Sequence, residues 1–595
     1  MSVPFARDGM SVPFARDGMS VPFTRRDDIM ACPLLTVRTE RRGGSAATDA
    51  DVEVRHNLFT LAPGAPFFDV SLPPSSVGFA QNERNTRSAG GTAVGRGSTR
   101  TNAGVGMVLA AALVVAAGCQ AQPRGSAPLA VVGDDVVLRW DDPLPARSAI
   151  FDGVVVRLRG ARGEVLGVQV LRAGVGAAPV ALTVEGLAVT GFAVDHHDVR
   201  RPSTAMYGGS RGAGRYPDRL TPVDGAVTAA RAAFFDVAIG RDAGPGLHRG
   251  ELVVGDVRIP VEVAVADVAM PDLAAAPRVW AYYNPGEVRR AHGVDDTLAL
   301  ERGYAALFRA HGVVASPELT AESWAARRDL VAGLPFVPVL LPRERSALEA
   351  EVAGWVARLA GTGQVGFAIP IDEPRAMADQ LRVRELAGWV RAAGGGPGRF
   401  LLAVTHQPTW ALGDQVDVYI SPFAVRAGQR RAAWTYNGTP PWAGSMVLDA
   451  AAGGPRTWGW IGFRYGVPLW YVWDALYWRD RHNAGRDTPG HDLVADPISF
   501  DDGGDHGNLD GVLAFPGPLA SLRLKALRRG QQDRALLEAL AACAGADAAQ
   551  AIARDVVPRA LGEVARGERP TWPATDVAWE AARGRVLDAL ARCPR

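Results

Sequence analysis

The stretch GFAIPIDEPR, residues 366–375, places two acidic side chains directly after an apolar run. The run has the composition of a buried β-strand, and Asp372, Glu373 and a proline follow it. A (β/α) barrel carries its chemistry at the carboxyl ends of its strands, so the arrangement predicts a catalytic strand end. The same two acids would also suit the N-terminus of the next helix. The surrounding sequence decides between these interpretations.

Two neighbouring carboxyl groups favour a division into one acid and one anion. Like charges at short distance oppose each other, so one of the two groups is expected to have a raised pKa. An acid together with an anion is the minimum equipment for cleaving a glycosidic bond. Asp372 and Glu373 are therefore the candidate catalytic residues.

Strand-like runs alternate with amphipathic helical stretches after residue 272. Helices are expected near 295–311, 345–360 and 376–393. The runs that would supply the strands are RVWAYYN (278–284), FVPVLLP (336–342), GFAIPID (366–372), FLLAVTH (400–406), VDVYISPF (416–423), AAWTYN (432–437), PLWYVWDALYW (468–478) and GVLAFPG (511–517). This rhythm predicts a TIM-type (β/α)8 barrel over residues 273–518.

Residues 119–272 show the alternation of half-buried strands. One face of 257–265 carries Val257, Ile259, Val261, Val263 and Val265. Gly255-Asp256 reads as a tight turn, and residues 154–158 and 165–170 read as a hairpin-like pair around Gly160–Gly163. Many short strands with regular turns predict an N-terminal β-sandwich.

The C-terminal segment, 519–595, is expected to form a helical cap. Leucines recur at helical spacing in 519–543, and 575–593 also reads as a helix. Cys543 and Cys593 fall at the ends of these two helices. In an oxidising compartment they are expected to form a disulfide.

The N-terminal segment has the features of an extension followed by an export signal. MSVPFARDG occurs at 1–9 and again at 10–18, and polar, Gly- and Arg-rich sequence follows, so 1–93 is expected to be disordered or a mis-assigned extension. Residues 94–118 read as a lipoprotein signal peptide with translation starting near Val94. An internal apolar helix is the alternative. Lipidation at Cys119 would give an exported, membrane-anchored lipoprotein facing the periplasm or the cell exterior.

Composition excludes several functional classes. The 595-residue chain has a formal charge of +1, is 48% hydrophobic and contains a single lysine, Lys525. We find no phosphate-binding loop, no GxSxG motif and no nucleic-acid signature, and we expect no cofactor. His196 and His197 are neighbours on a strand and point to opposite faces, so no metal site is expected there. The acidic segment 501–510 lacks the ligand spacing of a calcium loop and is expected to be a solvated turn.

Several motifs over residues 125–545 resemble glycoside hydrolase family 123, through the barrel catalogued as domain-of-unknown-function family 4091. The resemblance rests on their order and spacing: IPVEVAVADVAMPD (259–272), YPDRLTPVDG (216–225), the Asp-Glu-Pro triplet at 372–374, Asp449 with Arg456, Gly459 and Trp460, Trp473 with Trp478, Asp510-Gly511 with Pro516-Gly517, and SLRLKALRRGQQD (521–533). Ala475 and Leu476 depart from the family, which often has a polar residue there.

The resemblance implies a retaining N-acetyl-β-hexosaminidase, typically acting on N-acetylgalactosamine. In such an enzyme the 2-acetamido group of the substrate would attack C1, so the protein needs no nucleophile. Asp372 would then orient the acetamido group and stabilise the oxazolinium cation, and Glu373 would protonate the leaving oxygen. A glycosidase of another specificity and a non-catalytic glycan-binding surface lipoprotein are the alternatives.

Further residues are candidates for binding the carbohydrate. Strand-end residues and aromatic side chains that could stack on a sugar ring make up this set: Tyr282, Tyr283, Asn284, His406, Trp434, Tyr436 and Trp473. Packing in the barrel core is the alternative for the aromatic members, and a structural histidine is the alternative for His406. Asp449 and Arg456 are expected to be structural.

Overall fold

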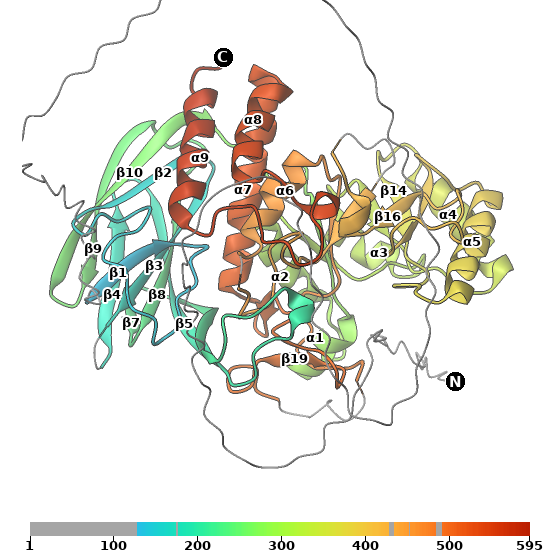
Figure 1. Ribbon diagram of the computed structural model, residues 1–595, viewed down its shortest axis with the longest axis horizontal. Helices are drawn as coiled ribbons and strands as arrows, with labels where there is room; N and C mark the ends of the chain where they lie inside the picture. Colours follow the sequence, from blue (N-terminus) through green and yellow to red (C-terminus); the bar gives the residue numbers. More distant parts are fainter. Residues whose placement is uncertain (1–127, 174–175, 428–432, 452, 484–490, 595) are drawn as a thin grey trace, which may run out of the picture. The chain divides into compact units, whose positions relative to one another are not determined.

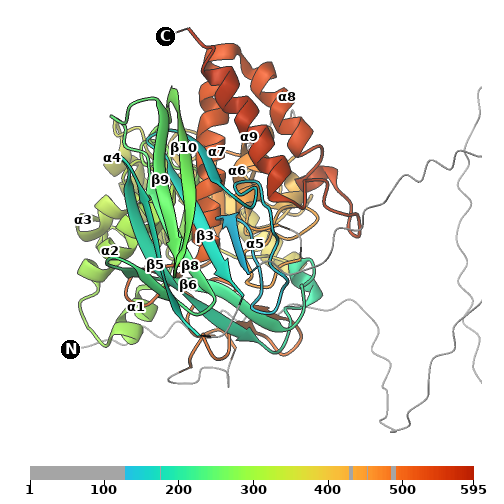
Figure 2. The same cartoon turned by 90° about the vertical axis from the view of Figure 1, so that its left-hand side faces the viewer.

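The first ten strands in the described part of the chain form two five-stranded sheets (Figure 2). A computed structural model describes residues 128–173, 176–427, 433–451, 453–483 and 491–594. The first sheet has the order β1 (Leu129–Gly133), β3 (Val165–Arg172), β8 (Ala232–Ala238), β5 (Ala188–Val199) and β6 (Gly214–Val223). The second has the order β2 (Val156–Arg162), β10 (Val257–Ala269), β9 (Gly246–Val254), β4 (Ala178–Val184) and β7 (Val227–Ala229).

A shared apolar cluster holds these two sheets together. Val168 and Phe235 of the first sheet belong to the same cluster as Val180 and Val263 of the second. Along β10, the expected alternation is present from Ile259 to Val265, where every second side chain is buried. Removing these alternating faces from water is the main favourable contribution to this region's stability.

The hairpin expected from 154–158 and 165–170 is wrong. β2 pairs in parallel with β10 of the second sheet, whereas β3 pairs with β1 and β8 of the first. The chain therefore crosses from one sheet to the other at Gly163, whose φ of 87° suits the crossing. Buried Glu164 fixes this corner by accepting a hydrogen bond from the Ala161 backbone at 2.6 Å. The local pattern predicts two strands but does not say which partners they take.

Eight parallel strands form the third sheet (Figure 1). Their order is β12 (Val314–Ser316), β11 (Val279–Tyr282), β18 (Trp470–Val472), β17 (Ala433–Tyr436), β16 (Val418–Ile420), β15 (Phe400–Val404), β14 (Val365–Ala368) and β13 (Phe336–Pro338). A parallel bridge between Leu319 and Val339 joins the two ends of this order. The strands thus form a ring in which neighbours in sequence are neighbours in space.

One strand of this ring differs from the sequence-based expectation. Residues 511–517 supply no parallel strand, because β21 (Ala514–Phe515) pairs antiparallel with β22 (Leu519–Ala520). The ring instead contains β12, which the sequence analysis missed. β12 is only three residues long and is too short to show a periodicity.

Helices follow several of the parallel strands. They are α1 (Pro285–His292), α2 (Leu298–Arg309), α3 (Trp324–Arg327), α4 (Arg345–Leu359), α5 (Met377–Ala392) and α6 (Arg456–Arg464). A short antiparallel pair, β19 (Ile498–Asp501) with β20 (His506–Asn508), lies after β18. No helix in the described part of the chain is long and apolar enough to cross a membrane.

Three further helices follow the parallel sheet and lie side by side (Figure 1). They are α7 (Leu522–Ala544), α8 (Ala546–Val556) and α9 (Asp576–Leu590). A disulfide joins Cys543 to Cys593, with the two Cα atoms 5.9 Å apart. α7 also contacts the first sheet, because Arg523 forms an ion pair with Asp218 at 2.7 Å.

The extension 1–93, the signal peptide 94–118 and the lipidated Cys119 remain predictions. All of them lie outside the residues that the structure describes.

Candidate active site

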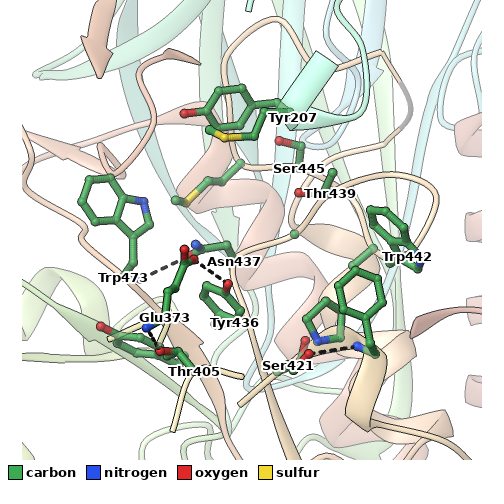
Figure 3. A pocket seen from close by; sticks show the side chains of 18 of the residues that line it. Tyr207, Glu373, Thr405, Ser421, Tyr436, Asn437, Thr439, Trp442, Ser445 and Trp473 are labelled. Atoms are coloured by element: carbon green, nitrogen blue, oxygen red, sulfur yellow. Dashed lines mark hydrogen bonds between the residues drawn. The ribbon is translucent and has the colours of Figure 1, made fainter. Parts of the chain in front are cut away.

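A cavity of about 410 Å³ lies at the carboxyl ends of β14 to β18. Asp372, Glu373, Thr405, Tyr436 and Tyr471 line it, each from the end of a parallel strand or the segment after it. Figure 3 shows Glu373, Tyr436 and Asn437 close together, with Trp473 on one side and Trp442 on the other. Side chains that are far apart in sequence meet here because the carboxyl ends of parallel strands share one edge of the sheet.

Thr405 fixes the two acids relative to each other. Its hydroxyl donates to Asp372 Oδ1 at 2.6 Å and accepts from the Glu373 backbone N–H at 2.6 Å. Thr405 follows β15 and is buried, so a neighbouring strand sets the conformation of the acidic pair. The sequence analysis did not identify Thr405, although it lies within FLLAVTH beside His406.

The backbone at Glu373 has an uncommon conformation. Its φ is +41°, and Asn437, another cavity residue, has a φ of +48°. A left-handed backbone costs a non-glycine residue roughly 1–2 kcal/mol. Such strained positions concentrate at functional sites, where surrounding contacts hold them. Here the Thr405 hydroxyl, which bonds to the Glu373 backbone and to the Asp372 side chain, is one of those contacts.

Both carboxylate oxygens of Glu373 accept hydrogen bonds. The Tyr436 hydroxyl donates to Oε1 at 2.8 Å, and the Arg375 guanidinium donates to Oε2 at 2.6 Å. The Arg375 side chain is 38% exposed, so it can move away from Glu373 into solvent. Tyr436 is held more firmly, as the last residue of β17.

Asp372 is the member of the pair whose pKa is raised. The surrounding protein desolvates it, and the neighbouring Glu373 charge adds to the effect, so that its pKa rises from 3.8 to about 6 despite the opposing Thr405 hydrogen bond. The side chain still reaches solvent through the cavity. A group inside a cavity can touch water while the protein around it keeps the local polarity low. At neutral pH Asp372 is therefore mainly an anion that is readily protonated.

Three of the predicted binding residues line the cavity. They are His406, Tyr436 and Trp473. The Trp473 indole donates to Asp510 Oδ1 at 3.2 Å, and its backbone N–H donates to the Asn437 side chain at 3.1 Å. His406 Nδ1 lies 2.7 Å from the Gln407 carbonyl oxygen and so donates to it.

The other four predicted binding residues do not line the cavity. Trp434 is 1% exposed and packs in the centre of the parallel sheet. Tyr283 is buried and donates to Glu301 at 3.0 Å, and Asn284 caps α1 by accepting from Gly286. Tyr282 packs against Trp280 in the same central cluster. Tyr282, Tyr283 and Asn284 were expected in the site because they end the first parallel strand, but the cavity lies beside β14 to β18. Trp434 lies on β17 beside the cavity, but its side chain belongs to the central cluster.

Asp510 lines the cavity as a third carboxyl group that the sequence analysis placed in a solvated turn. That expectation is wrong for Asp510, which is 6% exposed, and for Asp501, which is 2% exposed. Tyr207, from the loop between β5 and β6, donates to Asp510 Oδ2 at 2.8 Å. Burial raises the pKa of Asp510 to about 6.

Other residues discussed from the sequence have structural contacts. Asp449 is buried and accepts from Ser203, and buried Arg456 pairs with Asp533. His197 bonds to the Leu493 carbonyl and stacks on Phe515. Ala475 and Leu476 are buried and do not line the cavity, so this departure from the family does not alter the cavity wall. Within the described ranges, no group of three or more His, Cys, Asp or Glu side chains could hold a metal ion.

Comparison with known proteins shows a similar fold. No family model and no curated protein sequence matches the chain. A solved family 123 glycoside hydrolase from Clostridium perfringens, studied for glycolipid glycan hydrolysis, aligns at 12% identity and a TM-score of 0.52, covering 78% of this chain and 98% of that one. A family 2 member from Bacteroides cellulosilyticus aligns at 11% identity over 53% of this chain and 44% of its own, but its TM-score of 0.22 is too low to indicate a shared fold. The chain thus shares the fold of a family 123 hydrolase over most of both lengths.

Proposed function

We propose that this protein is a retaining glycoside hydrolase, specifically an N-acetyl-β-hexosaminidase of the N-acetylgalactosaminidase type that uses the 2-acetamido group of its substrate. The observation that carries the proposal is the adjacent pair Asp372–Glu373, fixed by Thr405 in a cavity at the strand ends. The fold shared with a family 123 glycoside hydrolase supports it. Aromatic side chains that can stack on a sugar, including Trp473 and Trp442, line the same cavity.

Adjacency of the two acids favours substrate assistance over a protein nucleophile. An ordinary retaining enzyme holds its acid and its nucleophile about 5 Å apart, on opposite sides of the scissile bond. Asp372 and Glu373 share one strand end and one anchoring hydroxyl, so they approach the sugar from a common side. The acetamido oxygen of the substrate can attack C1 from the other side.

The proposed reaction has two steps. In the first, Glu373 gives its proton to the glycosidic oxygen, the C1–O bond breaks, and the acetamido oxygen bonds to C1 to form an oxazolinium ion. Asp372, as an anion, accepts the acetamido N–H and stabilises this cation. In the second step, Glu373 takes a proton from water, whose oxygen attacks C1 and reopens the ring. Two displacements at C1 retain the β configuration.

Glu373 has to exchange a hydrogen bond before it can act as an acid. Both of its oxygens accept bonds from protein donors in the absence of substrate. The partly exposed Arg375 is the donor that can leave most easily, whereas Tyr436 is fixed in its strand. Substrate binding would therefore displace Arg375 and bring the glycosidic oxygen to Glu373 Oε2.

A substrate panel tests the proposal. Purified protein would be assayed with aryl N-acetyl-β-galactosaminide, aryl N-acetyl-β-glucosaminide and aryl β-galactoside, with Glu373→Gln as the matched control of lowered activity. Hydrolysis of an N-acetylated substrate, absent for the plain galactoside, is expected. Equal cleavage of the plain galactoside would overturn substrate assistance in favour of another glycosidase specificity. Binding without hydrolysis of any substrate would favour a glycan-binding protein.

We also propose that the two five-stranded sheets constitute the expected β-sandwich and that the parallel ring is a TIM-type barrel. For the N-terminal segment we propose cleavage before Cys119, lipidation of that cysteine and anchoring to a membrane. Mass spectrometry of the native protein tests this, because a mature N-terminus at lipidated Cys119 is expected. Peptides from residues 1–90 would contradict the proposal.

A further inference from the structure

The proposed reaction leaves Asp510 without a role, although Asp510 lies in the same cavity. It is 6% exposed, and both of its oxygens accept hydrogen bonds from neutral groups, the Tyr207 hydroxyl and the Trp473 indole. Burying a carboxyl group is costly, and hydrogen bonds or an opposite charge normally offset the cost. Asp449 is also buried among neutral donors, but it lies outside the cavity, whereas Asp510 lines the cavity and is placed to bind a polar ligand.

Backbone strain occurs next to Asp510, as it does at Glu373. Leu509 has a φ of +54°, and it is a buried, branched residue for which this conformation is unfavourable. The Ser499 hydroxyl holds the segment by donating to the Asp510 carbonyl oxygen at 2.7 Å. Gly511 follows with a φ of +69°, and a Cβ there would come within 2.9 Å of the Trp473 ring. The chain therefore packs its backbone tightly against Trp473 and turns the Asp510 side chain into the cavity.

Trp473 is held at both ends. Its indole N–H donates to Asp510, and its backbone N–H donates to Asn437, which itself has a left-handed backbone. The ring is thus fixed in the cavity wall (Figure 3), and the Asp510 carboxylate lies 3.2 Å from its indole nitrogen. A pyranose presents C–H groups on its faces and hydroxyl groups around its edge. A flat ring beside a carboxylate matches both of these surfaces.

Tyr207 reaches this site from the loop between β5 and β6, outside the parallel sheet. Ser203 anchors the loop by donating to Asp449 Oδ1 at 2.6 Å and by accepting from the Asn508 backbone at 2.9 Å. The first sheet therefore supplies a residue that completes the cavity of the third. Burial and the nearby Asp510 charge raise the pKa of Tyr207, so it remains a hydroxyl donor.

We propose that Asp510 and Trp473, with Tyr207 as a positioning residue, form the subsite that recognises a ring hydroxyl group of the sugar whose bond is cleaved. The inference rests on the proposed function and assigns its specificity. A carboxylate has about four acceptor positions, of which the Tyr207 hydroxyl, the Trp473 indole and the Gly511 backbone N–H occupy three. The remaining position accepts one sugar hydroxyl group while Trp473 stacks on the ring face.

The alternative is that Asp510 only holds Trp473 and Tyr207 in place. Deoxy substrates separate the two roles, because only a direct contact depends on one particular hydroxyl group. kcat/KM would be measured for aryl N-acetyl-β-galactosaminide and for its 3-, 4- and 6-deoxy forms. The variants are Asp510→Asn, which keeps an acceptor for the indole, and Ser499→Ala, a matched control that loosens the same segment but leaves the carboxylate.

Asp510→Asn is expected to lower kcat/KM on the parent substrate by about 10- to 100-fold, the usual effect of losing a charged hydrogen-bond partner. On the deoxy form that lacks the recognised hydroxyl, the loss should shrink to below about 3-fold, because the wild type has already lost that contact. Ser499→Ala should show the same ratio between parent and deoxy substrates as the wild type. An equal loss for Asp510→Asn on every substrate, or no loss, would overturn the proposal.

Tyr207→Phe gives an independent measurement of the positioning role. It should lower kcat/KM several-fold in the wild type and have almost no further effect in Asp510→Asn, because it acts only through that carboxylate. Additive losses would show that Tyr207 acts separately and would overturn its assignment. Thermal unfolding of each variant would confirm that the compared proteins are folded.

A binding experiment separates this proposal from the proposed function. Calorimetry would measure methyl N-acetyl-β-galactosaminide binding to Glu373→Gln and to Glu373→Gln/Asp510→Asn, neither of which needs to turn over. At least about 10-fold weaker binding to the double variant is expected. If no substrate is hydrolysed but this difference is present, the subsite stands and the catalytic proposal fails. If hydrolysis occurs and binding is equal, the subsite proposal alone fails.

Discussion

Two regions in the described part of the chain, the surroundings of helix α7 and the cavity, treat their carboxyl groups differently. Around α7, Asp533 lies 3.1 Å from Arg456 Nε and 3.0 Å from Arg583 Nε, and Arg529 lies 2.7 Å from Glu580. In the cavity, the partners of Asp510 are neutral, and Asp372 is bonded to the hydroxyl of Thr405. Around α7, arginines neutralise the buried carboxylates. In the cavity, Asp372 and Asp510 have no such partner among the described residues and remain available to bind a ligand or a proton.

The pKa shifts follow the same division. Burial alone would raise the pKa of Glu580, but Arg529, Arg456 and Arg583 together hold it well below its usual value. In the cavity, burial raises the pKa of both Asp372 and Asp510 to about 6. Paired charges tie α7 to its neighbours, and the unpaired carboxyl groups retain a capacity to bind or transfer protons.

A raised pKa by itself does not identify a functional group. Burial also raises the pKa of Asp134 to about 6, but Asp134 lies outside the cavity with Arg528 only 3.9 Å away. The difference is access to a ligand. Chemistry is therefore expected where an uncompensated carboxyl group and a cavity occur together.

The α7 region should respond to mutation mainly in stability. Asp533→Ala would remove the carboxylate that Arg456 and Arg583 share, although Arg456 keeps Glu580 and Arg583 keeps Glu164 as partners. Losing hydrogen bonds to charged groups in this way should cost about 1.5–3 kcal/mol. Urea denaturation should show this loss in the free energy of unfolding. The folded fraction should keep the wild-type kcat, because Asp533 does not line the cavity.

An exposed ion pair supplies the control for this prediction. Asp555 pairs with Arg585 at 2.8 Å, and both side chains are about half exposed or more, at 62% and 49%. Asp555→Ala should cost less than about 1 kcal/mol. If both substitutions had similar effects on stability, the distinction between the compensated interior and the surface would fail.

The cavity should respond mainly in activity. Glu373→Gln cannot protonate a leaving group, so turnover of substrates with poor leaving groups should fall by about 10³-fold, within the usual range for general acids. Aryl substrates with acidic leaving groups should lose less, because they need little protonation. Steady-state rates on two substrates of different leaving-group pKa would measure this. Equal losses on both would argue against Glu373 as the acid.

Asp372→Asn should reduce kcat by about 10²-fold, the scale for losing one electrostatic partner of a transition state. The asparagine can still accept from Thr405, so the geometry of the pair should persist. A thiazoline analogue of the oxazolinium intermediate should inhibit the wild type and bind more weakly to the variant. Unchanged inhibition would mean that Asp372 does not stabilise the intermediate.

The sequence predicted the elements better than it predicted their partners. Seven of the eight expected strand runs correspond to strands of the parallel sheet, and the motif at 366–375 leads into the cavity. β12 was missed because three residues cannot show a period, and 511–517 was assigned to the ring because an apolar run does not reveal its pairing direction. The hairpin at 154–170 failed for the same reason, since strand pairing is a long-range property.

Site residues whose chemistry shows in the local sequence were predicted. Site residues that depend on contacts between distant parts of the chain were missed. Asp372 and Glu373 are recognisable from their adjacency, and Tyr436 and Trp473 from strand ends. Asp510 is surrounded in sequence by aspartates and glycines that resemble a solvated turn, and only its contacts with Tyr207 and Trp473 reveal its burial. Tyr207 lies about 300 residues away in the chain, and no local pattern connects the two.

The smallest expected effect is a pH-dependent gain in the stability of Asp372→Asn, because this substitution removes a carboxyl group whose ionisation the cavity disfavours. The folded-state pKa of Asp372 is raised from 3.8 to about 6, so its contribution to stability is fully present below about pH 3.8 and is lost as the pH rises through about 6. An asparagine does not ionise and avoids this loss. Asp372→Asn should therefore unfold about 2 °C above the wild type at pH 7.5, with little difference near pH 4. The effect is modest because solvent in the cavity screens the charge.

Glu580→Gln should behave in the opposite way, because the pKa of Glu580 is lowered in the folded state. Its contribution to stability is present above the usual pKa of 4.5 and is lost as the pH falls. The variant should therefore be less stable than the wild type at pH 7.5, and this deficit should begin to shrink as the pH falls below 4.5, slightly at pH 4. Scanning calorimetry of both variants at the two pH values would measure the pair of trends. The difference in unfolding temperature between variant and wild type should change with pH in opposite directions for Asp372→Asn and Glu580→Gln. A change in the same direction for both would mean that the cavity and the α7 region do not differ in how they stabilise their carboxylates.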